Sequence, residues 1–135
     1  MPIAPEYRLT DADELLHRQV NPSFVQDGRI SSQVFKLNSH DDGQLSVSRG
    51  SKIEPRAAWE RYRARGNRSC GVVSVSVGEC NQLDLQAFDD VLEDDDAHGL
   101  IDMTGLSKSQ AEKKAAKLTA LARARGWQYQ DLGSE

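Results

Sequence analysis

The chain has 135 residues, a formal net charge of −4 and 38% hydrophobic residues. This length suits one domain with a self-sufficient core, and the composition excludes an intrinsically disordered chain. The negative net charge disfavours a dedicated DNA-binding protein, which usually carries a basic excess. We therefore expect residues 1–135 to form a single domain, with an extended lead-in at 1–9 and a C-terminal tail at 127–135.

The N-terminal residues lack the basic and apolar segments of a signal peptide. No apolar stretch approaches the roughly 20 residues of a membrane-spanning helix. We therefore expect a cytoplasmic protein with no membrane partner. The two cysteines, Cys70 and Cys80, form no CxxC motif, and we expect both to be reduced, small hydrophobic side chains.

The N-terminal third is predicted to contain short strands and turns. Leu15–Val20 is typical of a strand and is followed by a short helical segment at Ser23–Gln26. Arg29–Leu37 is predicted to be a second strand, and Leu45–Val47 a third. The turn-rich residues 38–44 between these two strands favour a hairpin with a long loop.

The middle of the chain carries the first clear helix and the clearest strand. Glu54–Arg65 is predicted to be helical, with Pro55 in its first turn and Gly66 just past its end. In Gly71–Val77, valines alternate with serines, which predicts a strand with one fully buried face. Gly78–Leu83 suits a helical turn.

Two short strands and a final helix complete the chain. Leu85–Phe88 and Gly99–Asp102 are candidate strands on either side of an acidic loop. Ser107 and Gln110 form a capping box that predicts a helix ending at Gly126. Because helices and strands do not alternate regularly, we expect an α+β fold, with a small mixed or mainly antiparallel sheet and the middle and C-terminal helices packed on one face.

Charge is segregated along the sequence. Twelve of the 17 basic residues lie in or beside the two predicted helices, and six of the 21 acids lie within residues 89–96. If the two helices share a side, they would present a basic surface to a charged partner. The alternative is that both helices carry ordinary solvated faces. The residues that we expect to contact a partner are Arg56, Arg61, Arg63, Arg65, Lys113, Lys114, Lys117 and Arg123.

The histidines and the acidic loop are weaker candidates. Clustered carboxylates at 89–96 attract hard cations, but the spacing of the well-known calcium loop is missing, so we expect no metal site. None of the three histidines stands at ligand spacing from another histidine or a cysteine. His98 is a catalytic candidate because Asp95 or Asp96 would hold it charged, although a structural histidine is the commoner case.

Arg18, Ser31 or Ser32, and Glu79 occur in the order of the arginine, serine and glutamate of the arginine-specific ADP-ribosyltransferases. The sequence resembles that family in this order, which implies an NAD-using transferase. In the family, the arginine and serine hold the nicotinamide cofactor and the glutamate supports attack on the ribose. The chain departs from the family's S-T-S motif, because Gln33 follows the serines, and Glu79 has no E-x-E or Q-x-E partner.

A broader resemblance covers most of the chain. The segments HRQVNPSF, GRISSQVF, LSV, AH and GLSKSQ with KKA are similar to a family of small, uncharacterised bacterial proteins. The resemblance implies a bacterial, self-contained domain. It implies no activity.

Three functional hypotheses follow from these patterns. The first is a non-enzymatic accessory protein that docks a macromolecular partner, expected to be a protein, through its basic helices and without a cofactor, in an immunity- or defence-associated setting. The second is an ADP-ribosyltransferase-like enzyme that uses NAD. The third is a nucleic-acid-binding protein, against which the acidic loop and the aromatic content of only 6% argue.

Overall fold

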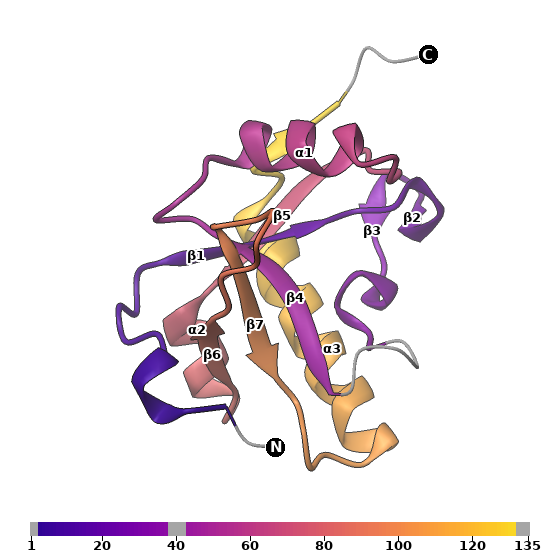
Figure 1. The fold of residues 1–135 in the computed structure, drawn as a ribbon. Coiled ribbons are helices and arrows are strands. Elements are labelled where there is room, and N and C mark those ends of the chain that lie inside the picture. The colour runs from indigo at the N-terminus through magenta and orange to yellow at the C-terminus, as the bar shows by residue number, and fades with distance from the viewer. Residues whose placement is uncertain (1–2, 38–42, 132–135) are drawn as a thin grey trace.

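The computed structural model describes residues 3–37 and 43–131, and its centre is a sheet of six strands in the order β6-β7-β4-β1-β5-β8 (Figure 1). All neighbouring strands run antiparallel. The strands are β1 (Leu15–Gln19), β4 (Gln44–Arg49), β5 (Gly71–Ser76), β6 (Gln86–Asp89), β7 (His98–Asp102) and β8 (Tyr129–Gln130). The prediction of an α+β fold with a mainly antiparallel sheet is confirmed.

Within the described residues, three α-helices accompany the sheet: α1 (Pro55–Ala64), α2 (Val77–Gln82) and α3 (Lys108–Arg125). The predicted middle helix is α1, the predicted C-terminal helix is α3, and the predicted helical turn is α2. The shorter elements are the 3-10 turns η1 (Pro5–Tyr7), η2 (Pro22–Phe24) and η3 (Ser32–Phe35), and a hairpin of β2 (Val25–Gln26) and β3 (Arg29–Ile30).

The C-terminal helix begins and ends where the sequence predicts. The Gln110 backbone N–H donates to the Ser107 hydroxyl at 3.1 Å, and the Ser107 N–H donates to the Gln110 side chain at 2.9 Å. Gly126 follows the last turn with a φ of +90°, a conformation that glycine adopts without strain. α2 begins with the same reciprocal arrangement between Ser76 and Glu79.

β5 is buried along its whole length, and α3 covers one of its faces. All six residues of the strand are buried. Val73 and Val75 belong to the main hydrophobic core together with Leu118 and Ala122 of α3. The alanine-rich side of α3 thus packs directly on the valine strand.

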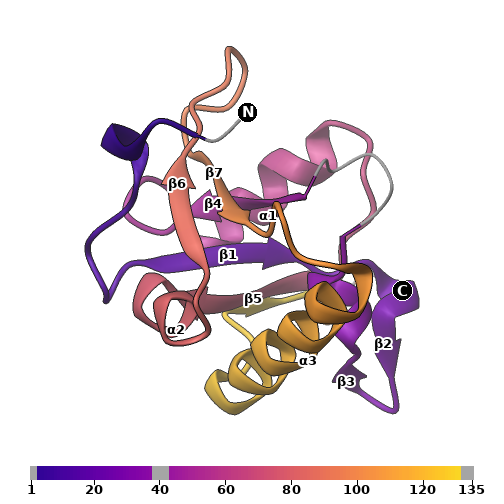
Figure 2. The same cartoon turned by 90° about the horizontal axis from the view of Figure 1, so that it is seen from below.

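The opposite face of β5 is covered by α1. Ser74 lies 2.7 Å from His17 of β1, and His17 forms a further hydrogen bond with the backbone of Ile53, just before α1. Ile53 in turn packs against Ala58 of α1. Because successive residues of a strand point to opposite faces, α1 and α3 lie on opposite sides of the sheet (Figure 2).

This placement differs from the single helix-covered face that we expected. The apolar side of an amphipathic helix shows that the helix packs on something, but it does not show which face of the sheet receives it. In β5 both faces are apolar enough to be covered, because its serines are small and are buried together with its valines.

The predicted second strand, Arg29–Leu37, is wrong. Only its first two residues form a strand, β3, which pairs with β2, and Ser32–Phe35 is the 3-10 turn η3. The helical segment predicted at Ser23–Gln26 is a 3-10 turn followed by β2. β4 pairs with β1 and β7 rather than with β3, and residues 38–42 of the predicted hairpin loop lie outside the described residues.

Segments expected outside the sheet lie at both of its edges. The predicted C-terminal tail supplies β8, which pairs with β5 at Val72↔Tyr129 and Gly71↔Gln130. The lead-in meets β6 at the isolated bridge Arg8↔Phe88, and the Leu9 N–H donates to the Ala87 carbonyl at 2.8 Å. One edge of the sheet is therefore met by Arg8 and Leu9, and the other is formed by Tyr129–Gln130.

Gly99 of β7 leaves a path for a side chain from the neighbouring strand. Arg49 of β4 reaches across β7 to Asp89 of β6, with its Nη1 2.9 Å from the carboxylate. A Cβ atom on Gly99 would lie 3.1 Å from Arg49 Cγ and 3.0 Å from the Phe88 carbonyl oxygen. A side chain at this position would therefore push against both the arginine and the backbone of β6.

We predict that Gly99→Ala lowers the free energy of unfolding by about 1–3 kcal/mol, because the added methyl group has no free space. Urea denaturation of the variant beside the unsubstituted protein measures the change. Ser46→Ala, at an exposed position of β4, is the matched control and should change stability by less than about 0.5 kcal/mol. Equal stability of the glycine variant and the unsubstituted protein would contradict the tight packing.

Candidate functional site

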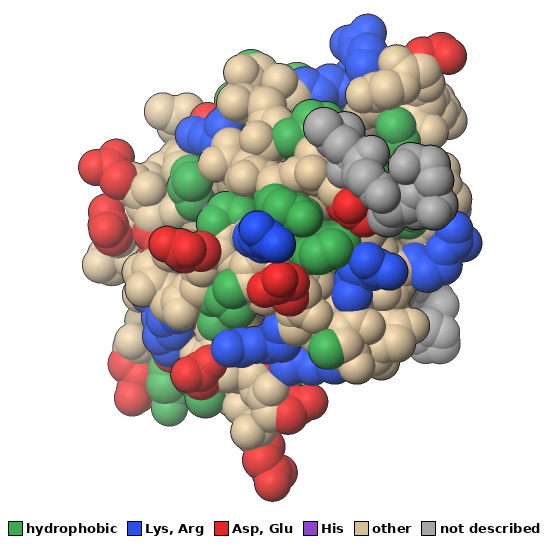
Figure 3. All heavy atoms as spheres, turned by 90° about the horizontal axis from the view of Figure 1, so that it is seen from above, with side chains coloured by type: hydrophobic (Ala, Val, Ile, Leu, Met, Phe, Trp, Pro, Cys, Tyr) green, Lys and Arg blue, Asp and Glu red, His purple; other side chains and the backbone are tan. Residues whose placement is uncertain are grey.

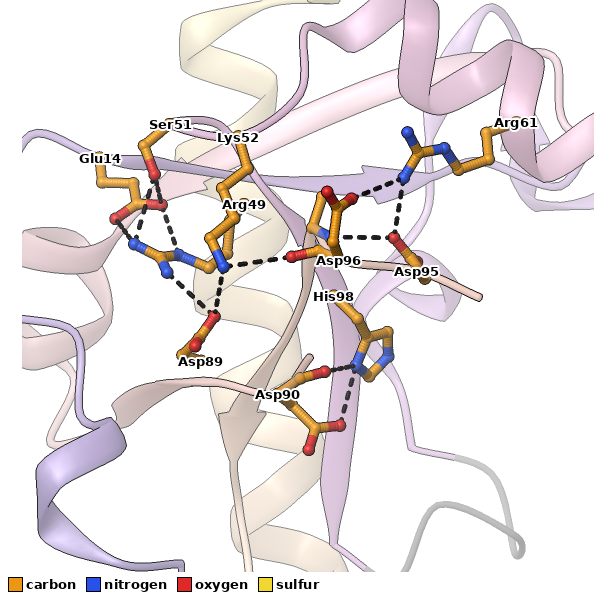
Figure 4. A network of polar contacts seen from close by, with 11 residues as sticks. Glu14, Arg49, Ser51, Lys52, Arg61, Asp89, Asp90, Asp95, Asp96 and His98 are labelled. Carbon is orange, nitrogen blue, oxygen red and sulfur yellow. Dashed lines mark hydrogen bonds and ion pairs between the residues drawn. The ribbon is translucent and has the colours of Figure 1, made fainter. Parts of the chain in front are cut away.

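Arg61 of α1 and Arg65, the residue that caps the end of this helix, lie against the acidic loop between β6 and β7. Arg61 Nη1 is 3.2 Å from the Asp95 carboxylate and 3.3 Å from that of Asp96 (Figure 4). Arg65 donates to the Asp94 carbonyl at 2.6 Å and lies 3.5 Å from the Asp95 carboxylate. The loop therefore docks on the helix, and carboxylates oppose the cations there.

The other two arginines of α1 predicted to contact a partner also have acidic neighbours. Arg56 lies 3.6 Å from Glu60 and Arg63 lies 3.9 Å from Asp131. Arg63 also stacks over the Trp59 ring, 4.9 Å from its centroid. On the side of the molecule that carries α1, basic and acidic side chains are interspersed (Figure 3). The structure thus does not join the cations of α1 with those of α3 in one basic surface.

Three cations of α3 are used within the fold. Their hydrogen bonds join Lys114 to the Leu83 carbonyl at 2.6 Å, Arg123 Nε to the Ile30 carbonyl at 2.8 Å and Arg125 to the Glu79 carboxylate at 2.6 Å. Lys114 and Arg123, which we predicted to contact a partner, therefore fasten the helix to neighbouring segments.

The remaining cations of α3 point into solvent. The single acid of the helix, Glu112, lies 3.7 Å from Lys36 of another segment. The outer α3 face, as we call it, is formed by the exposed residues Lys113, Ala116, Lys117, Ala120 and Ala124, and we include with it the exposed Lys108 at the start of the helix. No carboxylate in the described part of the chain pairs with its three lysines.

A groove of about 500 Å³ lies between α1, β4 and η3. It opens where β1 and β4 separate after pairing at only two positions. Arg18 of β1 spans this gap, since its Nε donates to the Val34 carbonyl at 2.7 Å and its Nη1 to the Ser46 carbonyl at 2.8 Å. Arg18 therefore ties the diverging strands to η3.

His98 lines the same groove as Arg18. Its Nδ1 lies 2.9 Å from the Asp90 carboxylate and 3.1 Å from the Asp90 carbonyl (Figure 4). The predicted partners, Asp95 and Asp96, instead bind Arg61. The side chain of His98 therefore binds Asp90 instead of Asp95 or Asp96. The loop turns back on itself, and the pairing of β6 with β7 brings Asp90 beside His98.

Glu79 does not reach this groove. It stands in the first turn of α2, where it accepts the Ser76 backbone N–H at 2.8 Å and pairs with Arg125 at 2.6 Å. Burial alone would raise the pKa of Glu79, but the bonds from Arg125 and Ser76 outweigh burial and lower it. The glutamate is thus an ionised helix cap, and the geometry does not unite it with Arg18.

The two candidate serines also stand in structural positions. Ser31 precedes η3, and its buried hydroxyl has no hydrogen-bond partner among the described residues. Ser32 is exposed in the first position of η3. The ADP-ribosyltransferase-like hypothesis therefore receives no support from the arrangement of its four residues.

A buried histidine–serine pair was missed by the sequence analysis. His17 is 3% exposed, and its partner Ser74 is fully buried in the valine strand. Burial lowers the pKa of His17, although the backbone of Ile53 and the charge of Glu14 act in the other direction. A neutral imidazole with a serine that solvent cannot reach is a structural pair rather than a nucleophile and its base.

A buried charge network was also missed. Glu14 is 7% exposed and accepts two hydrogen bonds from Arg49, at 2.9 and 3.0 Å, and one from Ser51 at 2.8 Å (Figure 4). Asp89 joins the network through Arg49 at 2.9 Å and Lys52 at 3.1 Å. These residues lie far apart in the sequence, so no local motif indicates that they meet.

Three other features of the described residues bear on function. No three His, Cys, Asp or Glu side chains of residues 3–37 and 43–131 gather as they would around a metal ion. Cys70 and Cys80 are free, and burial raises the pKa of Cys80 to about 12, which keeps that thiol protonated. Among the helices described, none has the length and apolar character needed to span a membrane.

We predict that Glu14→Gln weakens the dependence of stability on acidic pH. Burial would raise the pKa of Glu14, but the bonds from Arg49 and Ser51 and the charge of Arg49 outweigh burial and lower it below its ordinary value of 4.5. As the pH falls, Glu14 is therefore protonated in the unfolded chain before it is protonated in the folded protein. The stabilisation by Glu14 is present above pH 4.5 and is lost as the pH falls through the lower pKa of the folded protein.

Urea denaturation between pH 7 and pH 3 measures this effect. The variant should be less stable at pH 7 by about 2 kcal/mol, since it loses bonds to a charged group, and should lose less stability on acidification. Glu60→Gln, an exposed member of a surface pair, is the matched control and should follow the unsubstituted protein. An unchanged acid profile in Glu14→Gln would refute the assignment.

Comparisons of this chain with protein families, curated proteins and solved structures found no match. Its function therefore has to be inferred from its own surfaces, of which the outer α3 face and the groove beside His98 are the two candidates.

Proposed function

We propose that this protein is a non-enzymatic binding protein that docks the acidic surface of a partner protein on its outer α3 face. The observation that supports this most directly is the contrast between the two helices. The α1 arginines predicted to contact a partner have carboxylates beside them, whereas Lys108, Lys113 and Lys117 have none among the described residues.

The lack of a carboxylate paired with Lys108, Lys113 or Lys117 in the described part of the chain matters energetically. A partner's carboxylates can approach the three lysines without breaking any ion pair formed among residues 3–37 and 43–131. An approach to α1 would instead meet Arg61 and Arg65 already bound to the acidic loop. Complementary charge of this kind speeds encounter and selects the partner more than it raises affinity.

The side chains between the lysines suit close contact. Ala116, Ala120 and Ala124 recur every four residues, so they form a row along the exposed side of α3. Small side chains let another backbone approach the helix, and the partner would then bury apolar surface as well as charge.

A protein partner is favoured over nucleic acid by the amount of charge. Three lysines can neutralise about three phosphates, which gives a log–log salt slope of roughly −2.7 on duplex DNA. The whole chain, with these lysines included, has a net charge of −4, so phosphates would be repelled elsewhere on its surface. An acidic protein surface of limited size fits the outer α3 face better.

We predict that Lys113→Glu with Lys117→Glu weakens partner binding by about tenfold or more, because two favourable charge contacts become repulsive. Proteins retained from a lysate by the immobilised chain would be identified and purified. The affinity of each captured protein for the unsubstituted chain and for the double variant would be measured at about 50 mM and about 300 mM salt. The complex with the unsubstituted chain should be weaker at the higher salt.

Arg56→Glu with Arg68→Glu is the matched control. It changes the net charge by the same amount at exposed positions outside α3, and binding should stay within about twofold. Equal weakening by both double variants would refute a specific role for α3. Retention of DNA or RNA instead of protein, sensitive to Lys113 and Lys117, would support the nucleic-acid alternative and overturn the proposal.

A further inference from the structure

The acidic loop exposes two large apolar side chains at its end. Val91 is 56% exposed and Leu92 is 41% exposed, whereas most large apolar residues of the described chain are buried. Exposed acids follow them in the chain, since Glu93 comes directly after Leu92 and the side chains of Asp94 and Asp96 are 78% and 82% exposed. We call residues 91–96 the loop tip.

The fold holds the loop tip in place. Leu92 and Asp95 exchange two backbone hydrogen bonds, at 3.0 and 3.1 Å, which close a tight turn. Asp95 is 8% exposed and is anchored to α1 by Arg61 and Arg65. The exposed leucine and valine are therefore presented by an ordered turn, which reduces the entropy lost on binding.

The loop tip and the outer α3 face are complementary in chemistry. The loop tip offers two exposed apolar side chains and, in the next residues of the chain, exposed carboxylates, and the outer α3 face offers a row of alanines beside lysines. The ion pairs from α1 to Asp94 and Asp96 leave these carboxylates mostly in solvent, and exposed pairs of this kind contribute little, about 0–1 kcal/mol. Asp94 and Asp96 can therefore form ion pairs with lysines of another surface at little cost.

The two surfaces of one molecule cannot meet. The loop tip is fastened to α1, which lies on the opposite side of the sheet from α3, and Figure 2 shows the β6–β7 loop and α3 at opposite ends of the molecule. A contact between them must therefore join different copies of the chain.

We propose that the loop tip of one copy docks on the outer α3 face of a second copy. This inference rests on the proposed function, because it names the partner of the outer α3 face. The contact joins unlike surfaces, so each pair of molecules keeps one free loop tip and one free outer α3 face. Such head-to-tail contacts build open chains of copies unless the rotation between neighbours closes a ring.

The contact is small and therefore weak. Six residues of a loop bury much less than the roughly 800 Å² per partner of a standard interface. Charge carries much of the attraction, which falls as salt shortens the screening length from about 30 Å at 0.01 M to about 3 Å at 1 M. Association should therefore grow with protein concentration and fall with salt.

Sedimentation equilibrium of the full chain tests the proposal at several protein concentrations, at about 0.01 M and about 0.5 M salt. The average mass should rise above the monomer value of 15.0 kDa with concentration at low salt and return toward it at high salt. Lys113→Glu with Lys117→Glu, and separately Val91→Ser with Leu92→Ser, should each remain monomeric. All four side chains are exposed, and circular dichroism checks that both variants fold.

Mixing the two double variants gives the sharper measurement. The lysine variant keeps an intact loop tip, and the Val91→Ser, Leu92→Ser variant keeps an intact outer α3 face. The mixture should therefore form one-to-one dimers and nothing larger. A monomeric unsubstituted chain, association that persists in either variant, or a mixture without dimers would overturn the self-docking proposal.

Failure of self-docking can be told apart from failure of the proposed function. If the chain stays monomeric while a captured acidic protein still requires Lys113 and Lys117, the outer α3 face binds a different partner and only the self-docking proposal falls. If neither another protein nor a second copy depends on these lysines, both proposals fall.

Discussion

The structure depends on the burial of β5 on both of its faces. On one side Val73 and Val75 meet α3, and on the other Ser74 must satisfy its hydroxyl without water. A buried hydroxyl that lacks a partner is costly, so Ser74 is bound by His17, which burial keeps neutral. The same histidine bonds to the segment before α1. The strand thus fixes a helix on each side of the sheet.

Placing the helices on opposite faces divides the charges of the molecule. On one side, the arginines of α1 hold the acidic loop, and the network of Glu14 and Arg49 holds the base of that loop through Asp89. On the other side, the lysines of α3 have no acids to bind within the described residues. Although the chain has a net charge of −4, its described residues leave the lysines of the outer α3 face without a paired carboxylate, and the acidic loop lies at the opposite end of the molecule.

The features that sequence reasoning identified have local signals. The capping box of Ser107 and Gln110 and the alternation in the valine strand each lie within a few residues, and both elements were placed correctly. The failures concern contacts between distant segments. Glu14 and Arg49 are 35 positions apart and carry no common motif, while η3 shows an apolar pattern that also fits a strand. Of the predicted partner-contacting residues, only Lys113 and Lys117 lie on the outer α3 face.

The two margins of the sheet have a further consequence for the behaviour of the protein at high concentration. Exposed strand edges act as templates for stacking and fibril growth, because their peptide groups seek partners. Here β8 is only two residues long, and β6 already meets the Arg8 segment. The backbone groups at these positions are already paired within the chain. The contacts that we propose between molecules use side chains instead, so they would be reversible and sensitive to salt.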